Sequence, residues 1–440
     1  MKFSFCTLFF MAFLGCLQAQ NVNIPDANFK AALLNIASVN TNGDNEIQLS
    51  EAQAAQFVSV SNQGISDLTG IEEFTNIIAL FCSNNSLVTL DVRNLTKLST
   101  LVCSNNQLTN LQIATNNVSL TTLNAKNNQL TSIDLTGALD SVRILNLSHN
   151  QLTSVDISSL DDDTREVYLH NNQLTSITFP IDVVCTRFTC HHNQLTNLVV
   201  PMSPISFDCS NNPLDSLWIQ NTANTSRYTK CDSSQLRYIS FDQVTDSLVC
   251  SHNNLTNLNL NLNLNLRFNY IDCSYNMIDS IRLNNTTVKY LNASNNDLKI
   301  LGVDNANNNN VFPLDATNNP RLTCVQTNKS IPNAQANWTL PAGTTISNNC
   351  TNDWFSVNKI NNLPNVELFP NPSRGQVHIN LGQIYEEVNW AIYNNLGQLL
   401  QEQQQAATHQ LELSLPAAQG IYLIKIQTEK GQAVLKAIKE

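Results

Sequence analysis

The chain repeats one short unit along most of its length, and this repeat restricts its possible folds more than any other feature. The unit is clearest between Leu101 and Ile113, where it reads LVCSNNQLTNLQI, and it recurs every 19 to 23 residues. A single unit is too short to bury its apolar residues, so successive units must stack and share one continuous core. The copies begin at Val58, Leu80, Leu101, Leu123, Leu145, Val167, Phe188, Phe207, Thr229, Leu248, Ile271, Leu291 and Leu314.

The period and the pattern Leu-x-Leu-x-x-Asn-x-Leu are the signature of leucine-rich repeats. They predict a mainly β solenoid of about 13 coils over residues 57–322, with one strand of each coil in a parallel sheet. The second half of a unit, such as residues 130–135, again alternates apolar and polar residues. This alternation predicts a second short strand on the coil, and little helix is expected.

One column of residues, two positions after the first apolar residue of each copy, is predicted to point into the solenoid. Cysteine here fills places that other copies give to leucine, valine or alanine, so these thiols are interpreted as core residues. Cys185, which falls where other copies carry leucine or valine, is interpreted in the same way. Two alternatives stay open, namely disulfides between neighbouring coils and a column of metal-binding thiolates. The column reads Val60, Cys82, Cys103, Ala125, Leu147, Leu169, Cys190, Cys209, Cys231, Cys250, Cys273, Ala293 and Ala316.

A second column consists of asparagines at the turn that leaves the strand. A solenoid corner exposes backbone N–H and C=O groups that no sheet pairs, and a buried carboxamide can donate and accept to satisfy them. These asparagines are therefore predicted to be structural. Ser234 interrupts the column, so its coil should be the least regular. The asparagines are Asn85, Asn106, Asn128, Asn150, Asn172, Asn193, Asn212, Asn253, Asn276, Asn296 and Asn319.

The first residues predict an export signal over 1–19. Lys2 precedes an apolar run over residues 3–17 that is too short to span a bilayer comfortably. Ala19 is the expected cleavage point, and residues 13–16 bear a faint likeness to a lipoprotein processing box. No second apolar span follows, so no transmembrane segment is expected once the signal is removed.

An open solenoid exposes apolar residues at its ends, so both ends need caps. Over residues 20–56 the apolar spacing predicts two short helices, and the loop between them resembles the calcium loop of an EF-hand. The loop has two interpretations, a weak calcium site and a polar connection between the helices. No other cofactor is expected. The calcium ligands would be Asn40, Asn42, Asp44, Glu46 and Glu51.

The other end of the array predicts a cap and a linker over residues 323–362. Cys324 and Cys350 lie outside the inward column and enclose the last apolar coil. We predict a disulfide between them, which would close a loop of about 26 residues and stabilise the chain by about 3 kcal/mol.

Residues 363–440 follow a different pattern, in which short alternating runs are separated by turn residues and predict an antiparallel β-sandwich. Four segments are distinctive, namely FPNP at 369–372, NLG at 395–397, GIY at 420–422 and KAIK at 436–439. In this order they closely resemble the type A sorting domain of the type IX secretion system of Bacteroidetes. The resemblance implies recognition by the secretion machinery and a protein that is secreted or held at the outer-membrane cell surface. The repeats, which open with Ile24-Pro25-Asp26, similarly resemble surface leucine-rich-repeat proteins of that phylum.

Any binding site must use the outward strand positions, because the inward positions form the core. Charged and aromatic residues concentrate there in the middle of the array, whereas flanking coils carry small groups such as Ser83 and Thr100. The net charge of −11 comes with no basic stripe, so nucleic acid is not an expected partner. We predict a protein or glycan ligand, and the alternative is a solvated face on a structural spacer protein. The predicted ligand-binding residues are Glu166, Tyr168, His170, Arg187, His191, Asp208, Lys230, Asp232, Tyr270, Asp272 and Tyr290.

The sequence contains no recognisable catalytic arrangement, and the protein is not expected to be an enzyme. Cys190 and His191 are neighbours, but adjacent strand residues point to opposite faces, so thiol and imidazole cannot meet. His170 and His191 could stack on consecutive coils and hold a metal with Asp208, although chance placement on a polar surface explains them as well.

Overall fold

The computed structural model describes residues 20–115, 119–181, 183–219, 227–241, 246–258, 267–283, 287–303, 313–327, 337–348, 350, 363, 366–394 and 398–439. The chain divides into two compact units, Met1–Cys350 and Thr351–Glu440. The predicted export signal at 1–19 and the NLG segment at 395–397 lie outside the described residues.

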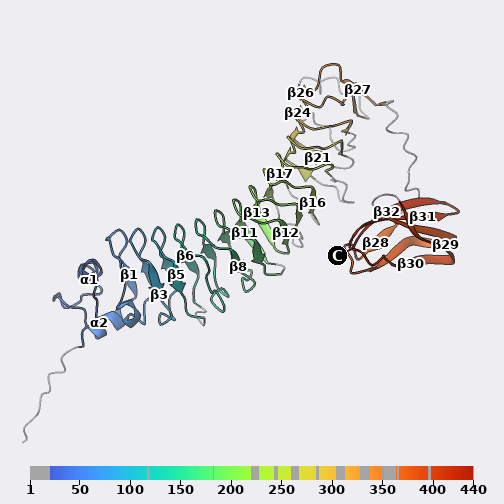
Figure 1. Cartoon of the computed structure of the whole chain (residues 1–440). Helices are drawn as coiled ribbons and strands as arrows, with labels where there is room; N and C mark the ends of the chain where they lie inside the picture. Colours follow the sequence, from blue (N-terminus) through green and yellow to red (C-terminus); the bar gives the residue numbers. More distant parts are fainter. Residues whose placement is uncertain are drawn as a thin grey trace, which may run out of the picture. The chain divides into compact units, whose positions relative to one another are not determined.

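A parallel sheet of 14 strands forms one side of the coils (Figure 1). Equivalent apolar residues of neighbouring copies pair in register, as Leu80 does with Leu101 and Leu101 with Leu123. Each predicted copy supplies a strand, and one more follows at Trp338–Thr339, beyond the predicted boundary at 322. The strands of this main sheet are β1 (Phe57–Ser59), β2 (Ala79–Phe81), β4 (Thr100–Val102), β6 (Thr122–Asn124), β7 (Ile144–Asn146), β9 (Glu166–Tyr168), β11 (Val184–Thr189), β13 (Ser203–Asp208), β15 (Tyr228–Lys230), β17 (Ser247–Val249), β19 (Tyr270–Asp272), β22 (Leu291–Asn292), β24 (Leu314–Asp315) and β26 (Trp338–Thr339).

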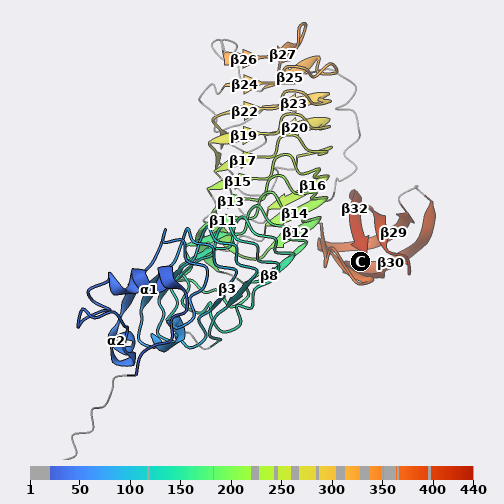
Figure 2. The ribbon, with the colours of Figure 1, turned by 60° about the vertical axis from the view of Figure 1, so that its left-hand side comes forward.

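Many coils carry a second short strand, as the alternation predicted. These strands form smaller parallel sheets, and Figure 2 shows most of them on the opposite side of the coils from the main sheet. They are β3 (Thr89–Asp91) with β5 (Asn110–Gln112), β8 (Ser154–Asp156) with β10 (Ser176–Thr178), β12 (Asn197–Val200) with β14 (Ser216–Ile219) and β16 (Tyr238–Phe241), and β20 (Ser280–Arg282) with β23 (Ile300–Gly302), β25 (Cys324–Gln326) and β27 (Thr345–Ser347). A further short pair is β18 (Arg267–Phe268) with β21 (Thr287–Val288).

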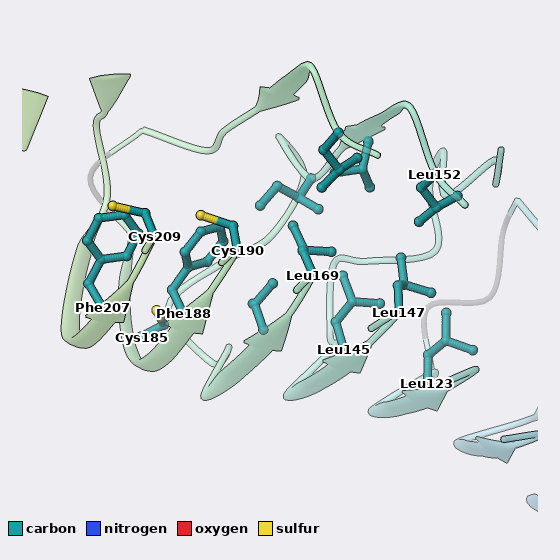
Figure 3. Packing of buried hydrophobic residues seen from close by; sticks show 14 of the residues in the cluster. Leu123, Leu145, Leu147, Leu152, Leu169, Cys185, Phe188, Cys190, Phe207 and Cys209 are labelled. Atoms are coloured by element: carbon teal, nitrogen blue, oxygen red, sulfur yellow. The ribbon is translucent and has the colours of Figure 1, made fainter. Parts of the chain in front are cut away.

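The core is built by alternate residues of the main-sheet strands. Phe188, Cys190, Phe207 and Cys209 lie side by side on successive coils (Figure 3), and the two phenyl rings are 5.8 Å apart. Burial raises the pKa of the Cys103 thiol to about 12, so the neutral thiol is the stable form. The interpretation of the repeat cysteines as core residues is confirmed, since those that the structure describes are buried free thiols. They are Cys82, Cys103, Cys185, Cys190, Cys209, Cys231, Cys250 and Cys273.

The asparagine column satisfies the backbone at the corner after each strand. The Asn106 Nδ2 donates to the carbonyls of Cys82 and Cys103 at 3.0 and 3.1 Å, and its Oδ1 accepts from Leu87 N at 3.1 Å. The same three bonds recur along the column as far as Asn319. The predicted structural role is therefore confirmed.

The coil of Ser234 departs from this arrangement, as predicted. Serine is too short to reach the previous coil, and its Oγ donates instead to the carbonyl of Asp232 at 3.0 Å. In the coil before it, Leu214 N donates to the backbone carbonyl of Asn212 at 2.8 Å rather than to a carboxamide.

Two short helices cap the amino-terminal end, as predicted: α1 (Ala27–Leu34) and α2 (Leu49–Ala54), with a 3₁₀ turn at Ile71–Glu73. Asp26 joins the cap to the first coil. One of its carboxylate oxygens accepts from Phe29 N at 2.9 Å and caps α1, while the other accepts from the backbone N of Ser66 and Asp67 at 2.9 and 3.1 Å.

At the other end, Cys324 and Cys350 form a disulfide with their Cα atoms 5.8 Å apart, the pairing that the sequence predicted. Two sheets continue into the predicted cap. Strand β26 extends the main sheet, and β25 and β27 extend the sheet of β20 and β23. The coil of Trp338 has Leu340 at the inward position but Gly343 in place of the asparagine, which explains why the sequence did not identify it.

The second unit is a five-stranded antiparallel sheet, which confirms the predicted antiparallel class. Its core includes Val377, Ile379, Ile392, Leu411 and Ile424. The strands are β28 (Glu367–Phe369), β29 (Gln376–Asn394), β30 (Leu399–Ser414), β31 (Gly420–Thr428) and β32 (Gly431–Lys439).

The first and last distinctive segments of this unit contact each other. The Asn371 side chain donates to the carbonyl of Lys436 at 2.8 Å and accepts from Ile438 N at 2.7 Å. Residues 65 to 67 positions apart are thereby joined, which gives both segments a structural role.

Candidate ligand-binding face

The predicted ligand-binding residues lie on the outward positions of the main sheet or in the turns after its strands. The register pairs Glu166 with Arg187 and Asp208 with Lys230, so residues from successive coils form continuous columns. By element, Glu166 and Tyr168 are in β9, His170 follows it, Arg187 is in β11, His191 follows it, Asp208 ends β13, Lys230 ends β15, Asp232 follows it, Tyr270 and Asp272 are in β19, and Tyr290 precedes β22.

Two of these residues, Asp208 and Asp272, have a local structural role. Asp208 Oδ1 accepts from the backbone N and the Oγ of Ser210 at 3.0 and 2.6 Å, and Asp272 makes the same pair of bonds to Ser274. Asn146, Asn292 and Asp315 repeat the arrangement in other coils. It is a turn cap that recurs through the array, so these two aspartates are poorer candidates for ligand contact than the sequence suggested.

The coils of β9 and β11 lack this aspartate–serine cap. They have Tyr168 with His170 and Thr189 with His191 at the two positions. Tyr168 donates its hydroxyl to Glu166 Oε2 at 2.9 Å, and His170 Nδ1 lies 2.9 Å from Thr189 Oγ1. These side chains contact one another rather than the backbone of the turn.

Lys230 lies between two carboxylates on the same face. Its Nζ is 3.9 Å from Asp208 and 3.5 Å from Asp232. Burial opposes the charge on the lysine, but the two carboxylates outweigh burial and raise its pKa. The positive charge of Lys230 is therefore balanced by carboxylates on the same face.

Imidazoles stack next to this group. The rings of His170 and His191 are 4.5 Å apart and nearly parallel, and His149 meets His170 edge-on at 5.4 Å. Burial, together with the neighbouring His191, lowers the pKa of His170 to about 4, so it is neutral at neutral pH. Lone pairs lie in the ring planes, so two stacked rings do not aim theirs at one point. Among the described residues, no group of three or more His, Cys, Asp or Glu side chains is placed to hold a metal ion, and the arrangement of His170, His191 and Asp208 is no exception.

Tyr270 and Tyr290 form a separate part of the face. Their rings stack 4.8 Å apart with an interplanar angle of 4°. Strand β17, which has Ser247 and Val249 at the outward positions, separates them from Lys230. The predicted patch therefore has two parts: a larger one on β9, β11, β13 and β15, and the tyrosine pair.

Three residues of this region were not among the predicted ones. Tyr228 lies in the same outward column as Glu166 and Arg187, so its position in the repeat could have identified it. His149 and His192 occupy the turn position just before the structural asparagine, where the backbone is left-handed, with φ of 55° and 54°. Most copies have asparagine here, which tolerates this conformation well.

The EF-hand-like loop is closed by its own hydrogen bonds. Glu51 is buried, and its carboxylate accepts from the backbone N of Thr41, Asn42 and Gln48 at 2.8, 3.2 and 3.0 Å. Asp44 Oδ2 accepts from the amides of Asn42 and Gln48 at 2.9 Å each.

The other three predicted calcium ligands are also engaged. Asn40 and Asn42 accept from Gly43 N and Asp44 N through Oδ1, and Glu46 pairs with Lys30 at 2.7 Å. Calcium binding needs about six to eight oxygen atoms that point at one centre. Here backbone N–H groups point at the carboxylate of Glu51 instead. In this arrangement the residues do not fit a calcium site, and the polar-loop interpretation is favoured.

Comparison with known proteins separates the two units. The model of the leucine-rich repeats (2 copies) family matches residues 118–161, and that of the secretion system C-terminal sorting domain matches residues 367–440. The chain is a leucine-rich-repeat protein with a sorting domain. This leucine-rich-repeat protein is therefore secreted or held at the cell surface, and the sorting domain implies the secretion machinery as its partner. Neither helix among the described residues has the length and apolarity needed to cross a membrane.

The chain is similar to several solved leucine-rich-repeat structures at low identity. The functional domain of InlJ from Listeria monocytogenes, which includes a cysteine ladder, is 17% identical, with 96% of this chain and 98% of that chain covered and a TM-score of 0.33. The internalin InlF of the same species is 17% identical over 63% of this chain and 92% of that chain, with a TM-score of 0.38. The APL1 leucine-rich repeat domain is 21% identical over 57% and 70%, with a TM-score of 0.45. No curated protein matches the sequence.

Proposed function

We propose that this leucine-rich-repeat protein is a surface-exposed binding or adhesion protein, and that a protein partner docks on the larger part of the mid-array face. One observation carries the proposal: Tyr168, His170, Arg187 and His191 gather large polar side chains on two neighbouring coils and have no part in the turn caps, whereas most other coils have serine at the position of the two histidines. Tyrosine and arginine are the residue types that contribute most to interface free energy.

A protein partner is favoured over a glycan by the way the rings lie. A sugar packs on the free face of an aromatic ring, and stacking removes one face of each ring here, since the centroids of His170 and His191 are 4.5 Å apart and those of Tyr270 and Tyr290 are 4.8 Å apart. Stacked rings present their edges and polar atoms, which suits hydrogen bonding to a polypeptide surface. The proposal is of binding rather than catalysis, because the thiols are buried and the imidazoles stack on one another.

The test has two stages. The purified mature protein, probed against protein and glycan arrays, is expected to give a saturable protein ligand. The triple variant Glu166→Ala/Tyr168→Ala/Arg187→Ala should then weaken binding at least tenfold without lowering the melting temperature. The matched control is Thr100→Ala/Val102→Ala, at the same outward columns of β4, and it should bind like the wild type.

Three outcomes would contradict the proposal. A saturable glycan ligand would assign the other ligand class. Unchanged binding by the triple variant would place the site elsewhere on the protein. No saturable ligand at all would support the alternative, a structural spacer whose repeat holds another part of the protein away from the cell.

A further inference from the structure

Two adjacent imidazoles converge at the end of β11. The Nδ1 atoms of His191 and His192 are 2.8 Å apart. Neighbouring residues of a regular strand point to opposite faces, but His192 has a φ of 54°, and this left-handed turn brings both rings to the same side. His191 is half-buried and His192 is exposed, so the pair is accessible from solvent.

At this distance the two rings form a hydrogen bond when one Nδ1 carries a proton, and the same separation can span a metal ion when both protons are on Nε2. With metal–nitrogen bonds of about 2.0–2.1 Å, two nitrogens at a right angle are about 2.9 Å apart, and at a tetrahedral angle about 3.3 Å. The observed 2.8 Å is close to the right-angle value, which is the geometry of square-planar Cu²⁺ and Ni²⁺.

Neighbouring side chains hold the His191 ring in place. The ring is stacked on His170, whose own Nδ1 lies 2.9 Å from Thr189 Oγ1. Asp208 lies on the next coil, where it pairs in register with Thr189, and its carboxylate offsets the charge of a cation.

We propose that His191 and His192 chelate a divalent transition-metal ion, Cu²⁺ or Ni²⁺, through their Nδ1 atoms. Imidazole nitrogen suits these ions, whereas calcium takes oxygen ligands. Two protein ligands leave the remaining coordination positions to water or to a side chain of a second molecule. The site is thus open and of moderate affinity, unlike a closed structural site with four protein ligands.

The test uses the untagged mature protein, freed of metal and titrated with Cu²⁺. We expect one saturable site, with electron paramagnetic resonance hyperfine structure from two nitrogen donors. His192→Asn should weaken Cu²⁺ binding at least tenfold and remove one nitrogen from the spectrum. Asparagine is the residue of Asn171 and Asn211 at the same turn position, with φ of 55° and 54°, so this variant should fold.

A matched control is available in the same array. His252 also lies at the left-handed turn position, with φ 53°, but it stacks on Tyr275 at 4.3 Å instead of facing a second imidazole. His252→Asn should leave the Cu²⁺ affinity and the spectrum unchanged. Full Cu²⁺ affinity in His192→Asn, or no saturable binding by the wild type, would overturn the proposal. Because no protein ligand enters the titration, its result is independent of the proposed docking function.

Discussion

Replacing one asparagine of the structural column should destabilise the solenoid strongly. Asn172 is 9% exposed; its Nδ2 donates to the carbonyls of Leu147 and Leu169 at 3.0 Å each, and its Oδ1 accepts from Leu152 N at 3.0 Å. Alanine would leave two carbonyls and one N–H buried without partners, and each such group costs about 1–3 kcal/mol. Some water can reach the site, so we expect Asn172→Ala to lower the free energy of unfolding by about 3–5 kcal/mol.

Urea unfolding followed by circular dichroism would measure this loss. Faster hydrogen exchange at Leu152 N would show that the loss arises at this corner of the coil. Asn172→Asp keeps the shape and the acceptor but lacks the donor, so it should cost at least as much as alanine. Ser234→Ala is the control, because it removes one hydroxyl bond at the interrupted coil and should cost about 1 kcal/mol. A loss below about 1 kcal/mol in Asn172→Ala, or equal losses in the two alanine variants, would refute the backbone-satisfaction argument.

Three further outcomes are expected. Asp26→Ala should lower the melting temperature, with a loss of about 2–3 kcal/mol, because it removes four hydrogen bonds, one of which caps α1. Burial opposes ionisation of Asp26, but hydrogen bonds from Phe29 and Ser66 outweigh burial and lower its pKa. The carboxylate therefore stabilises the folded protein above pH 3.8, and this stabilisation should be lost as the pH falls below that value. Reduction of the Cys324–Cys350 disulfide should cost about 3 kcal/mol and speed hydrogen exchange in the last coils only. The buried repeat thiols should resist a thiol reagent until the protein unfolds in urea.

The repeat made most of the fold predictable, because the same column positions recur in each copy and fix which side chains are inward. The inward cysteines and the corner asparagines could be assigned in this way. The coil of Trp338 could not, because it has Gly343 in place of the asparagine and Thr345 in place of the following leucine. Strand pairing to β24, rather than sequence pattern, identifies it.

The face was predictable as a set of positions but not as a set of roles. Alternation placed Asp208 outward, yet only the bonds to Ser210 reveal that it caps a turn. In a regular strand the side chains of His191 and His192 would point to opposite faces. The left-handed backbone of His192 instead brings both rings to the same side, and the sequence marks it only by a histidine where most other copies have asparagine.

The EF-hand-like loop offers a direct test of whether pattern or hydrogen bonding describes it better. Burial opposes ionisation of Glu51, but the hydrogen bonds from Gln48, Thr41 and Asn42 outweigh burial and lower its pKa. The carboxylate therefore stabilises the cap above pH 4.5, and this contribution should be lost as the pH falls below that value. Glu51→Gln turns an acceptor into a donor that faces N–H groups, so it should cost about 2–3 kcal/mol.

Because the loop closes on Glu51 itself, that cost should be the same in a chelator and in millimolar calcium. The wild type should likewise melt at one temperature in both solutions. A melting temperature that rises by several degrees with calcium in the wild type, and does not rise in Glu51→Gln, would show that an ion replaces these hydrogen bonds. The oxygens of Asp44 and Glu51 would then have to turn from their present donors toward a common point, which a structure with calcium would reveal.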